Sequence, residues 1–220
     1  MSGADTAPAA VVFGCAGLSL TPDEISLFRD CEPAGLILFA RNIDTPDQVR
    51  RLTDLFREIS GNGKILILID QEGGRVQRLR PPHWPEYPPM RLFGERAALD
   101  GDEAAACVAL NYRLIAADLV TLGINVNCAP VLDLPVEGSH EIIGDRAFSD
   151  DPALVSTLGQ AVCDGLLRGG VLPVIKHIPG HGRAFVDSHQ ELPQVNTPVW
   201  ELRRTDFAPF LDLSGAPAGM

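Results

Sequence analysis

The sequence predicts an α/β fold in which helices alternate with the strands of a parallel sheet. Short apolar runs rich in Val, Ile and Leu alternate with longer amphipathic segments, and these runs lack a polar residue at every second position. Strands that are buried on both faces have this pattern. In addition, Thr-Pro-Asp-Glu at residues 21–24 and Thr-Pro-Asp-Gln at residues 45–48 are typical helix starts, with a capping threonine before a proline.

The individual elements follow from these signals in chain order. Strands are predicted at residues 11–17, 35–40, 65–70, 125–130 and 171–178. Helices are predicted at residues 22–31, 46–60, 102–122, 152–168 and 198–213, a long surface loop at 81–89, and the start of a sixth strand at 216–220. This order requires parallel strands with right-handed crossovers, in either a doubly wound sheet or a (β/α)8 barrel.

The positions of polar residues favour the barrel. Arg41, Asp70, Asp133 and Lys176 lie near the carboxyl ends of four predicted strands, and in a barrel that end carries the active site. An open sheet often binds its ligand behind a Gly-x-Gly-x-x-Gly turn, and the sequence has none. Because a TIM-type barrel needs about 250 residues, we expect an incomplete (β/α)8 barrel of about five βα units plus the start of a sixth strand. It would form one domain over residues 1–220, truncated at its C-terminal end.

Composition excludes several classes of partner. The formal net charge of -11 and the isoelectric point near 4.8 disfavour nucleic-acid binding. The first ten residues lack the basic region of a signal peptide, and we find no apolar run long enough to span a membrane. Five cysteines lie mostly in apolar stretches without metal-ligand spacing. We therefore expect a cytoplasmic protein with reduced core cysteines and no membrane partner.

The first candidate motif is Asp-Gln-Glu-Gly-Gly-Arg-Val-Gln-Arg at residues 70–78, at the end of a predicted buried strand. Its carboxylates and guanidinium groups could bind sugar hydroxyls through charged hydrogen bonds. Alternatively, Asp70 caps a turn and the arginines lie in solvent. Gly-Asp-Arg-Ala-Phe at residues 144–148 supplies a further arginine after the fourth strand.

The second candidate motif contains three of the five histidines, in Lys-His-Ile-Pro-Gly-His-Gly at residues 176–182 and Asp-Ser-His at residues 187–189. Asp187 lies two residues before His189, so its carboxylate could orient the imidazole as a general acid/base. A metal site of His177, His181, Asp187 and His189 is an alternative, but the spacing matches no zinc pattern. We therefore expect no metal and no cofactor.

Together these motifs resemble those of the β-N-acetylglucosaminidases of glycoside hydrolase family 3, in the family's order and with similar spacing across nearly all 220 residues. The resemblance implies that Asp70, Arg78, Arg146, Lys176 and His177 bind an N-acetylglucosamine unit. It further implies that His189 is the general acid/base, held by Asp187, in place of the carboxylate that retaining glycosidases usually employ. The family's nucleophile is an aspartate beyond the last residue of this sequence, and no aspartate here matches it.

The expected activity is therefore retaining hydrolysis of terminal, non-reducing β-linked N-acetylglucosamine. The family's usual substrate is a cytoplasmic muropeptide of peptidoglycan recycling, and this chain alone is expected to be inactive. Two alternatives remain open within the same fold, namely a non-hydrolytic N-acetylglucosamine-binding protein and a glycosyl phosphorylase. An open sheet edge and uncovered apolar surface also predict an unstable or aggregating monomer.

Overall fold

The structure is a computed structural model that describes residues 7–61, 65–136, 138, 141–184, 192 and 194–220. Six parallel strands form one sheet in the order β1-β2-β3-β6-β7-β8. Their bounds are β1 Ala9–Phe13, β2 Pro33–Leu38, β3 Leu66–Ile69, β6 Val126–Asn127, β7 Leu172–Ile175 and β8 Ala218–Gly219. A separate antiparallel hairpin follows β3 and consists of β4 Gln71–Gly73 and β5 Val76–Gln77.

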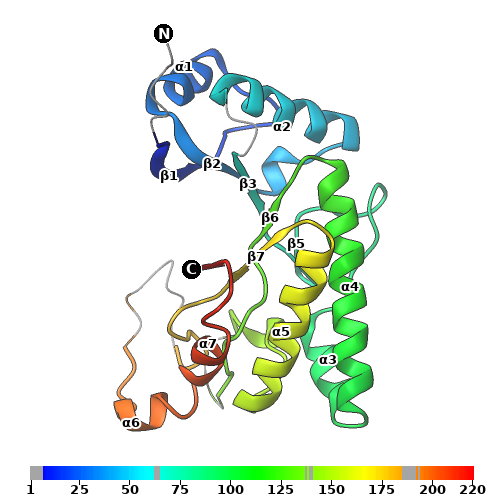
Figure 1. Cartoon of the computed structure of the whole chain (residues 1–220), viewed down its shortest axis with the longest axis vertical. Coiled ribbons are helices and arrows are strands. Elements are labelled where there is room, and N and C mark those ends of the chain that lie inside the picture. The colour runs from blue at the N-terminus through cyan, green and yellow to red at the C-terminus, as the bar shows by residue number, and fades with distance from the viewer. Residues whose placement is uncertain (1–6, 62–64, 137, 139–140, 185–191, 193) are drawn as a thin grey trace.

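Helices connect consecutive strands of this sheet (Figure 1). Their bounds are α1 Pro22–Cys31, α2 Pro46–Ser60, α3 Met90–Ala97, α4 Gly101–Thr121, α5 Pro152–Arg168, α6 Val199–Leu202 and α7 Ala208–Asp212, with 3-10 helices η1 Ala40–Asn42 and η2 Gly144–Arg146. In Figure 1, α1 and α2 lie beside the first strands, whereas α3, α4 and α5 pack together at the other end of the molecule. The curled parallel sheet is a half-barrel, so the predicted incomplete TIM-type barrel is confirmed.

Local sequence signals explain where the first helix begins. The Thr21 hydroxyl accepts a hydrogen bond from the Glu24 amide at 3.2 Å, and the Glu24 carboxylate accepts one from the Thr21 amide at 2.8 Å. This reciprocal pair satisfies two amide groups that the helix itself cannot bond. Because both partners lie within four residues, the start of α1 was predictable from the sequence.

Several predicted elements are corrected by the structure. The helix predicted at residues 198–213 is two short helices, α6 and α7, because Pro209 has no amide hydrogen and fits only the first turn of a helix. The strand predicted at 11–17 ends at Phe13, since the Cys15 carbonyl bonds the Arg41 and Asn42 side chains. The predicted strand at 125–130 is regular only over Val126–Asn127.

The segment 81–89 is irregular, as expected, but it is not simply a surface loop. Its Trp84 and Tyr87 side chains are buried in the main core, and the Tyr87 hydroxyl donates a hydrogen bond to Asp118 at 2.7 Å. The cysteine prediction is only partly right, because Cys107 is exposed and Cys31 is half-buried. The hydrogen bond from Tyr87 therefore links this segment to α4.

Among the described residues, one helix is long and apolar enough to cross a membrane by length and composition. This helix is α4, with a mean hydropathy of 1.3 over its most apolar window. In the fold it packs against α3 and α5, and its fully buried Tyr112 donates a hydrogen bond to the Glu72 carbonyl at 2.7 Å. The buried face of α4 thus packs within the fold, while Leu110, Leu114 and Val120 of the same helix are exposed.

Candidate functional site

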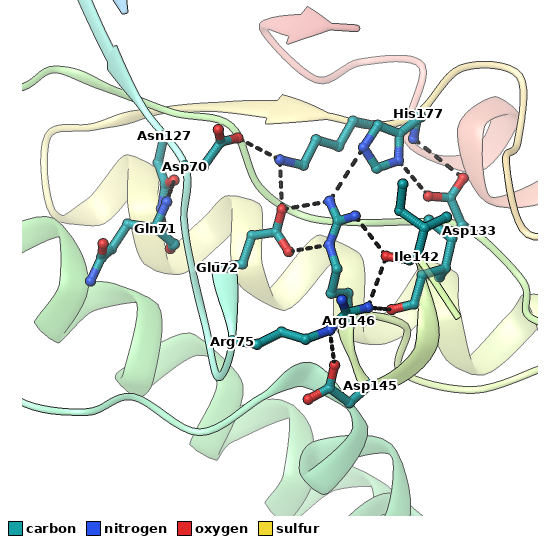
Figure 2. Close-up of polar contacts among 12 residues, drawn as sticks. Asp70, Gln71, Glu72, Arg75, Asn127, Asp133, Ile142, Asp145, Arg146 and His177 are labelled. Carbon is teal, nitrogen blue, oxygen red and sulfur yellow. Dashed lines mark hydrogen bonds and ion pairs between the residues drawn. The ribbon is translucent and has the colours of Figure 1, made fainter. Parts of the chain in front are cut away.

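Charged side chains from separate parts of the chain meet beyond the carboxyl ends of β3 and β7 (Figure 2). Asp70 directly follows β3, and Lys176 and His177 directly follow β7. Glu72 comes from β4 and Arg146 from η2. The carboxyl ends of all strands in a parallel sheet lie at one edge, and only β6 separates β3 from β7, so residues 106 positions apart come into contact.

The β4–β5 hairpin returns Arg78 to the side of Asp70. Gly73 in its turn has a φ of +100°, and a Cβ there would lie 2.3 Å from the Pro88 carbonyl oxygen, so only glycine fits. After the turn, the buried Gln71 side chain accepts a hydrogen bond from the Arg78 amide at 2.8 Å. The glycine pair of the motif therefore shapes the site by positioning backbone.

Asp70 lies between two cations. Lys176 Nζ donates to Oδ1 of Asp70 at 2.8 Å, and Arg78 Nη2 donates to Oδ2 at 2.9 Å. Burial opposes ionisation of Asp70, but the charges of Lys176 and Arg78 outweigh burial and hold the Asp70 pKa below its usual value. Asp70 is thus ionised and can only accept hydrogen bonds, so a ligand group that binds to it must be a donor.

Glu72, the second carboxylate of the first candidate motif, joins Lys176 to Arg146, although the family resemblance assigned it no role. Its side chain is 1% exposed, with Oε1 2.7 Å from Lys176 Nζ. Arg146 Nε and Nη2 donate to its two carboxylate oxygens at 2.8 and 2.9 Å, a bidentate pair. The available signal was its spacing, because residues 70 and 72 lie on one face of an extended chain.

Lys176 is the most buried cation of the cluster, with 3% of its side chain exposed. Burial alone would lower its pKa, but the carboxylates of Glu72 and Asp70 raise that pKa above its usual value. Lys176 therefore remains an ammonium group held between two carboxylates.

The segment that carries Arg146 is fixed by Arg75 of the hairpin turn. Arg75 Nη2 donates to the carbonyl oxygens of Glu141 and Ile142 at 2.7 and 2.8 Å, and Nε donates to Asp145 at 2.7 Å. Arg146 Nη1 donates to the Ile142 carbonyl at 3.1 Å. Figure 2 shows both arginines converging on this loop.

Asp133 is the second residue that was not assigned to the site. Its side chain is fully buried, and its Oδ2 lies 2.5 Å from His177 Nδ1. Its Oδ1 accepts hydrogen bonds from the backbone amides of His181 at 2.7 Å and His177 at 3.4 Å. The other ring nitrogen of His177, Nε2, lies 3.4 Å from Arg146 Nη2.

The structure brings together all five residues that were expected to bind the sugar. Arg78, Asp70, Lys176, Arg146 and His177 form one connected network through Glu72. Their roles toward a ligand stay predictions. The expected acid/base pair Asp187 and His189 lies outside the described residues, as do two of the four side chains of the alternative metal site.

Within the ranges that the structure describes, no group of three or more His, Cys, Asp or Glu side chains is placed to hold a metal. The two described members of that alternative, His177 and His181, have ring centroids 6.0 Å apart in an edge-to-face contact. The arrangement that is described is instead a closed array of ion pairs beside a histidine. Such an array offers oriented donors and acceptors to a polar, hydroxyl-rich ligand.

Comparisons with known proteins assign the chain to a family. Residues 19–220 match the glycosyl hydrolase family 3 N terminal domain. The chain is 38% identical over 209 residues to a beta-hexosaminidase of Chromobacterium violaceum, covering 95% of this chain and 58% of that protein. It is 39% identical over 199 residues to a beta-hexosaminidase of Pseudomonas aeruginosa, covering 90% of this chain and 57% of that one.

Solved structures agree with this assignment. The crystal structure of NagZ from Neisseria gonorrhoeae in complex with N-trifluoroacetyl-D-glucosamine superposes with a TM-score of 0.90 at 34% identity, over 97% of this chain and 63% of that chain. A family 3 beta-N-acetylglucosaminidase from Paenibacillus gives a TM-score of 0.86 at 35% identity, over 95% and 39% of the two chains. The chain belongs to glycoside hydrolase family 3. It spans less than two thirds of the length of the curated relatives that it matches.

Proposed function

We propose that this chain supplies the sugar-binding part of a retaining glycoside hydrolase that removes terminal, non-reducing β-linked N-acetylglucosamine. The observation that carries the proposal is the Lys176-centred array of ion pairs at the carboxyl edge of the sheet. It is supported by relatives that are named beta-hexosaminidases and by a similar structure that holds N-trifluoroacetyl-D-glucosamine.

The chemistry of the array suits a sugar. Pyranose hydroxyls both donate and accept hydrogen bonds, and the cluster offers both cationic donors and carboxylate acceptors within a few ångströms. The Asp70 carboxylate would accept from hydroxyl groups, while Arg78, Lys176 and Arg146 would donate to them. Because the ion pairs hold these side chains in place before a ligand arrives, little side-chain entropy is lost on binding.

The chemical step needs a proton donor and a nucleophile. We propose that His189, oriented by Asp187, donates the proton to the departing glycosidic oxygen, a contribution of about 10² to 10⁴ in rate. Neither Asp70 nor Asp133 suits nucleophilic attack, because the first is bound by two cations and the second is fully buried. The proposal therefore assigns the nucleophile to neither of these two aspartates.

The proposed setting is peptidoglycan recycling in the cytoplasm, with a muropeptide that carries terminal N-acetylglucosamine as substrate. This setting rests on the resemblance of the four motifs to those of the family's β-N-acetylglucosaminidases. The net charge of -11 agrees with a small-molecule substrate in preference to a polyanion. No nucleic-acid partner and no membrane partner is proposed.

Binding and turnover test the proposal separately. We expect the chain to bind N-acetylglucosamine in calorimetric titrations, and Lys176→Met to weaken binding at least tenfold. Asp47→Asn, which changes an exposed ion pair on α2 outside the array, serves as the matched control. Absence of N-acetylglucosamine binding by the folded chain would reject the proposed ligand.

Release of nitrophenol from a nitrophenyl N-acetyl-β-glucosaminide then separates the reaction classes. Turnover that His189→Ala abolishes supports a glycosidase. Binding without turnover by this chain, and by any longer form of its reading frame, supports the non-hydrolytic sugar-binding alternative. A sugar phosphate as product in phosphate buffer supports the phosphorylase.

A further inference from the structure

His177 presents a ring nitrogen to the ion-pair array, and its hydrogen-bonding character depends on the tautomer of the ring. Among the residues that the structure describes, the ring contacts the Asp133 carboxylate at Nδ1, the Arg146 guanidinium at Nε2, and the His181 ring edge-to-face. A neutral imidazole has one N–H donor and one bare acceptor nitrogen. The identity of its two partners therefore determines which nitrogen carries the hydrogen.

Asp133 can only accept at His177. Its Oδ2 lies 2.5 Å from Nδ1, and its Oδ1 already accepts from the His181 amide at 2.7 Å. Both oxygens of this fully buried carboxylate are acceptors, one facing the ring nitrogen and the other the His181 amide. The hydrogen of the ring consequently belongs on Nδ1.

Arg146 leads to the same tautomer from the opposite side of the ring. A guanidinium group has only donors, and its Nη2 faces Nε2 of His177 at 3.4 Å. A hydrogen on Nε2 would set two donors against each other, and an imidazolium would add a repulsion between like charges. Nε2 therefore carries no hydrogen, and its lone pair faces the Arg146 guanidinium.

We infer that Asp133 is a positioning residue that fixes His177 in the Nδ1–H tautomer, so that Nε2 accepts the proton of one particular hydroxyl of the bound sugar. The sugar part of this inference rests on the proposed function. The hydroxyl would take the single lone pair of Nε2 in place of the 3.4 Å contact from Arg146, and it can still accept from a neighbouring cation. A sugar that lacks this hydroxyl hydrogen would therefore bind more weakly.

The backbone around the ring supports a fixed orientation. A Cβ at Gly182 would lie 1.8 Å from the Leu134 carbonyl oxygen, so glycine is required where the loop after His177 packs on the residue after Asp133. The same carboxylate thus holds the ring through Oδ2 and the start of the following loop through Oδ1. Such second partners commonly set the tautomer of functional histidines.

The test uses Asp133→Asn, which keeps the shape of the side chain. Its carbonyl oxygen can still accept from the His181 amide, while its amide group must donate to Nδ1 and forces the hydrogen to Nε2. Nitrogen-15 spectra of the neutral rings distinguish protonated from bare ring nitrogens, and His177→Gln identifies the His177 signals. We expect Nδ1–H in the unmodified chain and Nε2–H in Asp133→Asn. Nε2–H in the unmodified chain overturns the inference without any ligand.

Fluorinated sugars test the acceptor role. Fluorine replaces a hydroxyl as an acceptor but cannot donate, so we expect one of the 3-, 4- and 6-fluoro analogues of N-acetylglucosamine to bind about tenfold more weakly than the parent sugar. Asp133→Asn should bind the parent sugar about tenfold more weakly and lose that discrimination, whereas Asp47→Asn, at an exposed ion pair on α2, should keep it. Full discrimination in Asp133→Asn overturns the acceptor role. If no sugar binds, the proposed function fails, while the spectra still decide the tautomer.

Discussion

At the scale of single residues, the site depends on Glu72, a buried anion that two cations share. Lys176 and Arg146 both pair with it, and they belong to separate parts of the chain. Sequence motifs identified the cations, because Lys176 and Arg146 stand in recognisable segments. The partners that hold them were not predictable, since the Arg146–Glu72 pair spans 74 residues and the His177–Asp133 pair spans 44.

Replacement of Glu72 by glutamine should therefore destabilise the fold. Glu72→Gln leaves Arg146, whose side chain is 12% exposed, without its bidentate partner and removes one of the two carboxylates at Lys176. The expected loss is about 3 kcal/mol of unfolding free energy in urea titrations. The Arg75–Asp145 pair is more than 40% exposed on each side. Asp145→Asn should consequently cost less than about 1 kcal/mol. Equal losses in the two variants would contradict the buried role of Glu72.

Lys176 predicts a dependence of stability on alkaline pH. Its folded-state pKa is raised, so its stabilising contribution is fully present below the ordinary lysine pKa of about 10.4 and is lost as pH rises through the higher folded value. The sequence has only two lysines, Lys64 and Lys176. Carbon-13 labelling of lysine should thus give two signals, with Lys64→Arg identifying the remaining one. Titration of Lys176 below pH 10.4 in the folded chain would refute the prediction.

At the scale of elements, contacts between α4 and α5 set how closely the helices cover the sheet. A Cβ at Gly165 of α5 would lie 2.4 Å from the Ala109 carbonyl oxygen of α4, a contact with backbone that cannot rotate away. Local sequence signals predicted both helices to within one residue at each end. They did not predict this crossing, because it depends on which faces meet after the strands have paired.

Gly165→Ala should force α4 and α5 apart and lower the melting temperature, with a cost of about 1 to 3 kcal/mol. Gly101→Ala is the matched control, because Gly101 is also helical and a Cβ there meets nothing within 4 Å. That control should be neutral or slightly stabilising, since alanine favours helix. Thermal unfolding followed by circular dichroism measures both. A neutral Gly165→Ala would mean that the helices are not packed this tightly.

One helix prediction based on the local sequence pattern was wrong. Residues 198–213 have an amphipathic sequence, yet Pro209 divides them into α6 and α7. The buried side chain of Asp206, between the two helices, accepts from Arg183 Nε at 2.7 Å. A polar contact of this kind competes with a continuous helix, and periodicity alone does not reveal it.

At the scale of the whole molecule, the half-barrel has two open edges, β1 and β8, in the described part of the sheet. Beside β8 lies a largely apolar groove of about 760 Å³, lined among others by Ile178, Phe207, Phe210 and Leu211. The incomplete barrel was predictable because the number of βα units and the chain length could both be read from the sequence. The shape of this groove was not, since it depends on how α6 and α7 fold back.

Exposed apolar surface beside an open edge should make the chain self-associate. Leu211, 63% exposed in the groove, is the test position, and Leu99, 78% exposed outside it, is the control. Leu211→Glu should shift light-scattering profiles toward monomer at high protein concentration, whereas Leu99→Glu should change them less. Equal effects would mean that added charge alone, and not the groove, controls association.

The ion-pair array also has a kinetic consequence. Arg78, Lys176 and Arg146 carry three positive charges, and the carboxylates paired with them and with His177, at Asp70, Glu72 and Asp133, carry three negative ones. Equal and opposite charges this close together cancel within a few ångströms, so the array projects little field into solvent although the whole chain is strongly acidic. An uncharged sugar would then arrive by unsteered diffusion, and its association rate should scarcely respond to ionic strength.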